Sequence, residues 1–206
     1  MMTSLHEVLI KVRRYATKLL AGELLSGYTF HELKHTSFVV SSCYELSIAC
    51  KCSANDLASV LMAAWLHDVG YVGGRDNHEE RGANMAMDFL SSVDCPFDVQ
   101  VQVQKLILST RLPTSPISIL EEIICDADLS HLGAVSYPVW ELRLREELEK
   151  VDGLIYSDEM WREKNITFFR NHSYYTEKAH RLWNYQKQRN LIQMCAMTNS
   201  LHPDRK

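Results

Sequence analysis

The sequence predicts an all-α fold, and three of its features carry that prediction. Apolar residues recur at spacings of three and four along most of the chain, which is the period of an amphipathic helix. Serine, asparagine and proline residues stand where several of these patterns begin, as they do at helix starts. No stretch alternates apolar and polar residues strongly enough to predict a β-strand. A chain of 206 residues can bury one substantial core, so we expect a single domain over residues 1–206.

The first two helices are expected before residue 51. Residues from about 4 to 25 place their leucines and valines on one face, and Gly27 closes the segment. The second helix has a buried face that runs from His35 to Cys50. A titratable ring in the first turn of such a face is unusual unless it has a partner, so His35 is a candidate functional residue.

The third and fourth helices are expected to begin at capping boxes. Ser53 and Asp56 have the required spacing, and the helix that they open ends at about residue 67. The glycine-rich segment 70–76 then predicts a loop. Asn77 followed by Glu80 is the second box, with Glu80 reaching back to the helix start. Five further helices are expected at about 96–110, 117–131, 137–150, 157–170 and 174–197.

Composition excludes several classes of protein. The net charge of −4 leaves no basic surface for bulk nucleic acid. No apolar run reaches the roughly 20 residues that cross a bilayer, and the N-terminal sequence lacks the pattern of a secretory signal. Most of the six cysteines fall in apolar helical patterns, as buried reduced thiols do. We therefore expect a soluble cytoplasmic protein without a membrane partner.

The segment Leu66-His67-Asp68-Val69-Gly70 predicts a metal site. Adjacent residues on a helix point about 100° apart, so His67 and Asp68 reach one ion only where the helix ends beside a cavity. Imidazole and carboxylate together suit a divalent first-row ion better than calcium. Such a dipeptide is unspecific alone and needs further ligands from other helices. His35 precedes it, and Asp126-Ala127-Asp128 follows it at the end of another apolar pattern.

This ordered set resembles the HD-domain superfamily of metal-dependent phosphohydrolases. The resemblance rests on His35-Thr36, on Leu66 to Gly70, and on Ile124-Cys125-Asp126-Ala127-Asp128-Leu129. Two further stretches, at residues 28–35 and 77–80, are similar to stand-alone members known only as predicted phosphohydrolases. The resemblance implies a helical-bundle HD core at about residues 28–135, with a C-terminal helical extension at about 136–198.

The resemblance also implies how the metal is held. One divalent ion (Mn, Co, Ni, Fe or Mg) would be bound by His35, His67, Asp68 and Asp128. Asp126 is the alternative to Asp128, and its other role would be to orient a ligand through hydrogen bonds. Members with two ions add histidines between the His-Asp pair and the last acid, and here only His78 lies in that interval. A single ion is therefore expected.

The implied chemistry is hydrolysis by a metal-activated water. The ion lowers the pKa of the water and offsets charge on the phosphoryl group. Asp68 and Glu79 are the candidate catalytic residues, with Glu79 as the proton acceptor; its alternative role is a favourable acid at a helix start. Arg145 has an alternative as well, in ion pairs on the surface of its own helix. The candidate substrate-binding residues are His31, Lys34, His78, Arg111, Arg145 and His172.

We therefore expect a phosphohydrolase that cleaves a phosphoester in a small phosphorylated metabolite, with a nucleotide as the favoured substrate. The alternative is a catalytically silent HD fold that binds a nucleotide or a metal as a sensor or partner module. The strongly charged helix expected at 141–150 is a candidate homodimer interface.

Overall fold

The computed structural model describes residues 4–24 and 26–201, and within them it contains α-helices and two 3-10 helices but no strand. The all-α prediction is confirmed. Contacts between Cα atoms divide the chain into two compact units, Met1–Ser26 with His31–Asp128 and Gly27–Phe30 with Leu129–Lys206.

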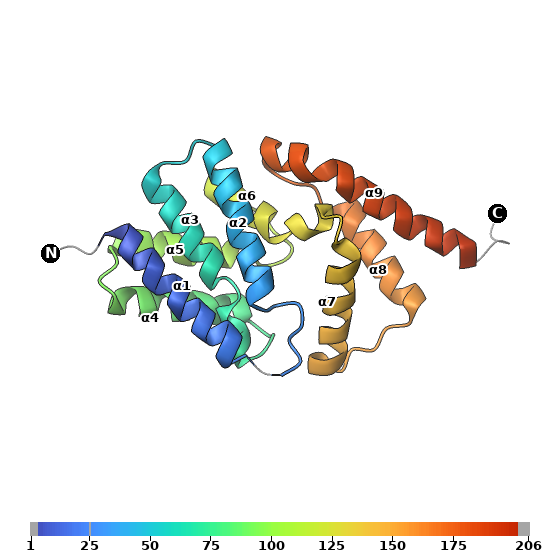
Figure 1. Ribbon diagram of the computed structural model, residues 1–206, viewed down its shortest axis with the longest axis horizontal. Helices are drawn as coiled ribbons and strands as arrows, with labels where there is room; N and C mark the ends of the chain where they lie inside the picture. Colours follow the sequence, from blue (N-terminus) through green and yellow to red (C-terminus); the bar gives the residue numbers. More distant parts are fainter. Residues whose placement is uncertain (1–3, 25, 202–206) are drawn as a thin grey trace. The chain divides into compact units, whose positions relative to one another are not determined.

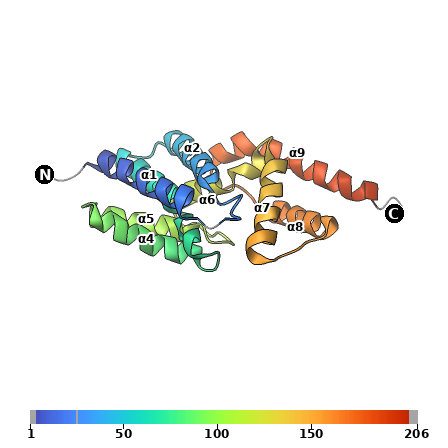
Figure 2. The ribbon, with the colours of Figure 1, turned by 60° about the horizontal axis from the view of Figure 1, so that its bottom comes forward.

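The first unit is built around one central helix. α3 packs against five other helices of the unit, α1, α2, α4, α5 and α6 (Figure 1). Its side chains Val60, Met62, Ala63 and Leu66 are therefore completely buried, and the helix is apolar on more than one face. Figure 2 shows α4 and α5 lying side by side in this unit. The elements are α1 (Leu5–Gly22), α2 (Leu33–Ala49), α3 (Ala54–Leu66), η1 (Val69–Gly73), α4 (His78–Ser92), α5 (Phe97–Ser109) and α6 (Ile119–Asp128).

The two predicted capping boxes have different outcomes. Ser53 caps α3, because its hydroxyl accepts a hydrogen bond from the Asp56 backbone N–H at 3.1 Å. The box predicted at Asn77 is wrong. Asn77 adopts the left-handed conformation with φ of 54° and its side chain makes no capping hydrogen bond. The Glu80 carboxylate accepts a hydrogen bond from Arg111 at 3.2 Å instead.

The turn after α3 is held against α4 by close backbone packing and by one guanidinium. Nη1 of Arg81 donates to the carbonyl oxygens of Gly70 at 2.7 Å and Gly74 at 2.8 Å, and Nη2 donates to that of Asp76 at 2.7 Å. A Cβ atom on Gly70 would lie 2.0 Å from the carbonyl oxygen of His78. Only glycine fits this position, so η1 and the start of α4 form one rigid corner.

The second unit contains η2 (Ser130–Gly133), α7 (Tyr137–Asp152), α8 (Asp158–Asn171) and α9 (Glu177–Leu201). The segment 27–30 is fixed to α7, since the backbone N–H of Phe30 donates to the Glu147 carboxylate at 2.8 Å. Nδ2 of Asn190 on α9 donates to the carbonyl oxygens of Leu132 and Ala134 at 2.8 and 3.0 Å. The core between these elements consists of Leu129, Leu132, Tyr137, Ile166, Phe169 and Met194.

The predicted helix ranges are close to the observed ones, and the differences lie at the ends of helices and in the segment 70–76, which was predicted as a loop but begins within η1. The helix expected at about 117–131 ends at Asp128, and η2 follows it as a separate turn. The last helix begins at Glu177 rather than at about 174. Within the described residues, none of the helices combines the length and the apolar character that crossing a bilayer requires.

Gly70→Ala tests the rigid corner after α3. We expect the substitution to lower the free energy of unfolding by about 2 to 3 kcal/mol, because the added methyl group overlaps the His78 carbonyl. Urea unfolding followed by circular dichroism measures the change. Gly22→Ala is the matched control, since a Cβ atom there meets nothing within 4 Å and the change should stay within about 1 kcal/mol. Equal stabilities of the two variants would contradict the close approach.

Candidate metal centre

The end of α3 makes it possible for two adjacent side chains to reach one point. His67 is the last residue with helical dihedral angles, at φ −59° and ψ −36°. Asp68 departs from them, with φ −103° and ψ 1°. Both side chains are buried, with relative exposures of 1% and 3%. Within a helix, adjacent side chains point about 100° apart. Because the helix ends between His67 and Asp68, their side chains can point toward the same place.

His67 is oriented by its own helix. Its Nδ1 donates a hydrogen bond to the Ala64 carbonyl oxygen at 2.9 Å, which fixes the lone pair of the neutral ring on Nε2. This Nε2 lies 3.1 Å from Oδ2 of Asp68 and 3.5 Å from Oδ1 of Asp128. A ring held in this way by a backbone carbonyl has the arrangement of a metal-binding histidine.

His35 approaches the same point from the first turn of α2. Its Nε2 lies 3.0 Å from Oδ1 of Asp128 and 3.6 Å from Oδ2 of Asp68. The packing of α2 against both α3 and α6 brings these side chains together. His35, His67 and Asp128 each offer one ligand atom, and these atoms all lie within 4.8 Å of one another. Asp68 adjoins both imidazoles of this group.

The donor set fits a divalent ion. His67 Nε2 and Asp68 Oδ2 are buried, and neither makes a hydrogen bond within the part of the chain that the structure describes. Their 3.1 Å contact is short but lacks the alignment of a hydrogen bond. Buried polar atoms without a hydrogen-bond partner are rare in proteins, and a bound ligand or ion is a common explanation for them. Two imidazoles and two carboxylates are ligands that a first-row divalent ion accepts.

The electrostatics of the cluster are those of mutually stabilising charges. Burial alone would lower the pKa of His67, but the carboxylates of Asp68 and Asp128 outweigh it and raise that pKa well above its ordinary value. Burial alone would likewise raise the pKa of Asp68 and Asp128. The neighbouring imidazoles outweigh it and lower the pKa of both acids. Without a metal, protons therefore occupy the centre, and an ion would have to displace them.

The two acids at the end of α6 occupy different positions. Asp128 is the one in the cluster with His35 and His67. Asp126 is completely buried, but it precedes Asp128 by two residues, and two positions on a helix differ by about 200° in direction. The arrangement favours Asp128 over Asp126 as the ligand. The ligand set itself stays a prediction.

His31 and His78 lie beside this centre, together with a residue that sequence reasoning missed. The ring of Tyr71 stacks on His31 at 4.1 Å and on His78 at 4.0 Å between centroids. The ring of His31 is 6.0 Å from that of His35. Tyr71 is 3% exposed. The sequence gives no signal for a role of Tyr71, because it belongs to no motif. The same holds for Arg81, whose side chain binds the loop that contains Tyr71.

Two more predicted residues, Glu79 and Arg111, lie next to each other in the first unit. Oε2 of Glu79 is 3.7 Å from Nε of Arg111 and 3.5 Å from Nδ1 of His78. Arg111 also pairs with Glu80, at 3.2 Å. Lys34 is an exposed residue of α2, one position before His35. The guanidinium of Arg111 is thus already paired with acids at the start of α4.

The remaining two predicted residues belong to the second unit. Arg145 donates from Nη1 to the Asp158 carboxylate at 2.7 Å and from Nη2 to the Tyr156 carbonyl at 2.6 Å. The ring nitrogens of His172 are buried and find no hydrogen-bond partner among the described residues. Burial, followed by the nearby charge of Lys187, lowers the pKa of His172 to about 3. This ring is therefore neutral at physiological pH.

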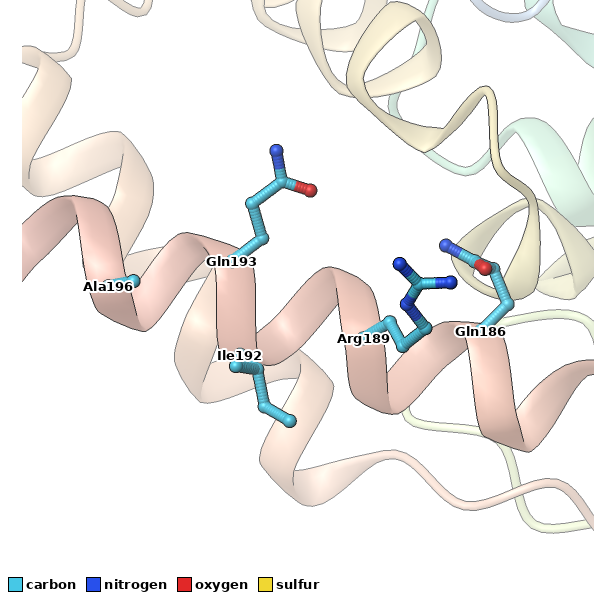
Figure 3. Close-up of a pocket in the computed structure, with 5 residues that line it drawn as sticks. All are labelled: Gln186, Arg189, Ile192, Gln193 and Ala196. Carbon is cyan, nitrogen blue, oxygen red and sulfur yellow. The ribbon is translucent and has the colours of Figure 1, made fainter.

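A surface hollow on α9 has a different character. It is lined by polar and aliphatic side chains from this helix alone (Figure 3). No imidazole or carboxylate contributes to it, so it offers a divalent ion no suitable ligands. The lining residues are Gln186, Arg189, Ile192, Gln193 and Ala196.

Comparison with solved structures shows the same fold in several bacterial proteins. One is a predicted HD superfamily hydrolase from an uncultured Thermotogales bacterium, with 21% identity, coverage of 94% of this chain and 89% of that one, and a TM-score of 0.55. A Lactobacillus plantarum protein has 16% identity, coverage of 99% and 100%, and a TM-score of 0.72. Bacillus subtilis YpgQ, solved in complex with ADP, has 16% identity, coverage of 95% and 98%, and a TM-score of 0.64.

At these identities the similarity shows the fold alone. No curated protein matches the chain. Residues 33–132 match the model of the HD domain family, within the core expected at about 28–135. This segment contains His35, His67, Asp68 and Asp128, whose side chains converge in the first unit. Through residues 33–132, the chain belongs to the HD domain family.

Proposed function

We propose that the chain is a metal-dependent phosphohydrolase that cleaves a phosphoester in a nucleotide. The observation that carries the proposal is the buried cluster of His35, His67 and Asp128, with Asp68 beside it. Membership of the HD family and the similarity to a predicted HD superfamily hydrolase support a hydrolase. The nucleotide rests on weaker support, the ADP bound to YpgQ, which shares the fold.

The chain's own residues would supply a rigid and charged site for this reaction. His35, His67, Asp68 and Asp128 would hold one divalent ion, which when bound supplies an activated water and offsets phosphoryl charge. The Ala64 carbonyl keeps Nε2 of His67 directed at the centre. Burial of both imidazoles excludes bulk water and strengthens their interaction with the carboxylates.

Positive or donor groups around the centre would bind the phosphate. His31, His78 and Arg111 are the candidates in the first unit, and Lys34 is exposed next to His35. Glu79 is the candidate proton acceptor, and its contact with Arg111 would hold its carboxylate in place. Arg145 and His172 stay candidates from the sequence. Arg145 already pairs with Asp158, and His172 is a neutral ring whose nitrogens are buried.

Metal analysis with a hydrolysis screen tests the proposal. The purified protein should bind about one divalent ion per chain and hydrolyse at least one of a panel of mono-, di-, tri- and cyclic nucleotides with Mn²⁺, Co²⁺, Ni²⁺ or Mg²⁺. His35→Ala should lower kcat/KM at least about 100-fold, since loss of a ligand should cost more than loss of a supporting hydrogen bond. His180→Ala, at an exposed residue of α9, should keep full activity. A metal-loaded protein inactive on the whole panel would contradict the proposal.

Isosteric substitutions separate the two acids of α6. Asp128→Asn should lower the affinity for Mn²⁺ at least about 100-fold, because it removes a charged ligand from the cluster. Asp126→Asn should lower that affinity less than Asp128→Asn does, because Asp126 lies outside the cluster. Isothermal titration calorimetry with Mn²⁺ measures both, with circular dichroism as the check on folding. The reverse order of the two effects would transfer the ligand role to Asp126.

Metal binding should depend on pH. Since the pKa of His67 is raised in the metal-free protein, this ring is protonated below that pKa, and the ion must displace the proton. The apparent affinity for Mn²⁺ should therefore fall by about tenfold per pH unit for each proton displaced as the pH drops. Calorimetry in two buffers with different ionisation enthalpies counts the protons released. Binding that releases none at pH 7 would contradict the raised pKa.

A further inference from the structure

Three rings beside the metal centre form a stack whose middle member is a tyrosine. The ring planes of Tyr71 and His31 differ by 19°, and those of Tyr71 and His78 by 29°. A hydrogen bond of 3.1 Å also joins the Tyr71 hydroxyl to Nε2 of His31. Tyr71 is buried, while both imidazoles are partly exposed. The tyrosine is therefore the buried member of the stack, and the two imidazoles are the members that solvent reaches.

The proton on His78 has a defined position. Its Nδ1 lies 2.9 Å from the carbonyl oxygen of Arg75, and a carbonyl can only accept, so Nδ1 carries the proton. In the neutral ring Nε2 is then an acceptor, and it makes no hydrogen bond with any residue that the structure describes. Stacking on Tyr71 fixes the plane of the ring, so this acceptor has a set direction.

His31 is complementary to His78. When the Tyr71 hydroxyl donates to Nε2 of a neutral His31, the proton of that ring lies on Nδ1, where it is a donor. The centroid of the His31 ring lies 6.4 Å from that of His78 and 6.0 Å from that of His35, so His31 is the member of the stack that lies next to a residue of the cluster. One tyrosine thus orders a donor on one side of its ring and an acceptor on the other.

Tyr71 itself is held by the rigid corner that follows the His-Asp pair. The three carbonyl oxygens bound by Arg81 belong to residues on both sides of Tyr71. The preceding Gly70 lies so close to α4 that the loop cannot move away without breaking this packing. Arg81 makes no ion pair with a carboxylate of the described residues, so its guanidinium serves the loop alone.

We propose that Tyr71 is a positioning residue of the active site. It orients His31 as a donor to a phosphoryl oxygen of the substrate and His78 as an acceptor for a hydroxyl or water proton next to that phosphoryl group. This inference deepens the proposed function and rests on it for the identity of the substrate. The stack itself is a property of the protein without substrate or metal.

The first test reads the two rings directly by ¹⁵N-histidine NMR on the full-length protein. In the wild type both His31 and His78 should have the proton on Nδ1. Tyr71→Phe keeps the stack but removes the hydroxyl, so His31 should lose this preference and His78 should keep it. Tyr15→Phe is the matched control, because Tyr15 also stacks in this unit, on Phe89 at 4.1 Å. A His31 ring unchanged in Tyr71→Phe would overturn the inference, whatever the enzyme's activity.

The second test measures binding and turnover with the Mn²⁺-loaded protein. Tyr71→Phe should weaken ADP binding by about two- to tenfold, the worth of one hydrogen bond, with unchanged Mn²⁺ affinity. In hydrolysis the same variant should raise KM more than it lowers kcat. Arg81→Lys, which keeps the charge but loses the planar fork, should weaken ADP binding in the same direction. ADP binding unchanged in both variants would overturn the inference.

The two proposals fail in different ways. A wild-type protein that hydrolyses no nucleotide contradicts the proposed function, while the NMR and ADP measurements still decide the role of Tyr71. Conversely, full hydrolysis by Tyr71→Phe with unaltered KM and unaltered His31 overturns the positioning role and leaves the phosphohydrolase intact.

Discussion

The structure depends on the burial of two imidazoles against two carboxylates at the end of the central helix. Taking such charges out of water costs several kcal/mol for each unpaired group, so none of the four is stable there without the others. The opposite pKa shifts of His67 and Asp68 express this mutual dependence. The ends of α2, α3 and α6 must therefore meet, because each brings at least one member of the cluster. A divalent ion would replace the protons and meet the same requirement with a stronger interaction.

The packing of α3 makes this meeting possible. Ala63 and Ala64 are completely buried, and small side chains allow neighbouring helices to approach the last turn closely. The Ala64 carbonyl then serves a second purpose as the acceptor for His67. The same turn leads directly into Gly70, where close approach to α4 positions the stack of His31, Tyr71 and His78. The His-Asp cluster and the stack of three rings are therefore both positioned by the same end of α3.

The sequence predicted the helical fold and the separate segments of the cluster because both follow from local patterns. Periodicity identifies a buried face, and a histidine or acid on such a face, as at His35 and Asp128, signals a partner. The Asn77 box failed because the spacing of residues does not determine φ. Asn77 is left-handed, whereas a capping residue normally has an extended backbone, and its side chain makes no capping hydrogen bond. Tyr71 and Arg81 escaped prediction for a related reason. Their roles depend on which backbone carbonyls and rings a loop presents after folding, and no periodic pattern encodes that.

A comparison of two buried histidines shows why burial alone does not make a metal ligand. His67 and His172 are both withdrawn from water, and burial lowers the pKa of each. Around His67 the neighbours are carboxylates, which reverse the effect and attract cations. Around His172 they are Lys187 and two further histidines, which add to it, and this charge environment repels a cation. The sign of the surrounding charge therefore decides the role. The same difference makes the cluster in the first unit suitable for a divalent ion, whereas His172 is a neutral ring beside a lysine.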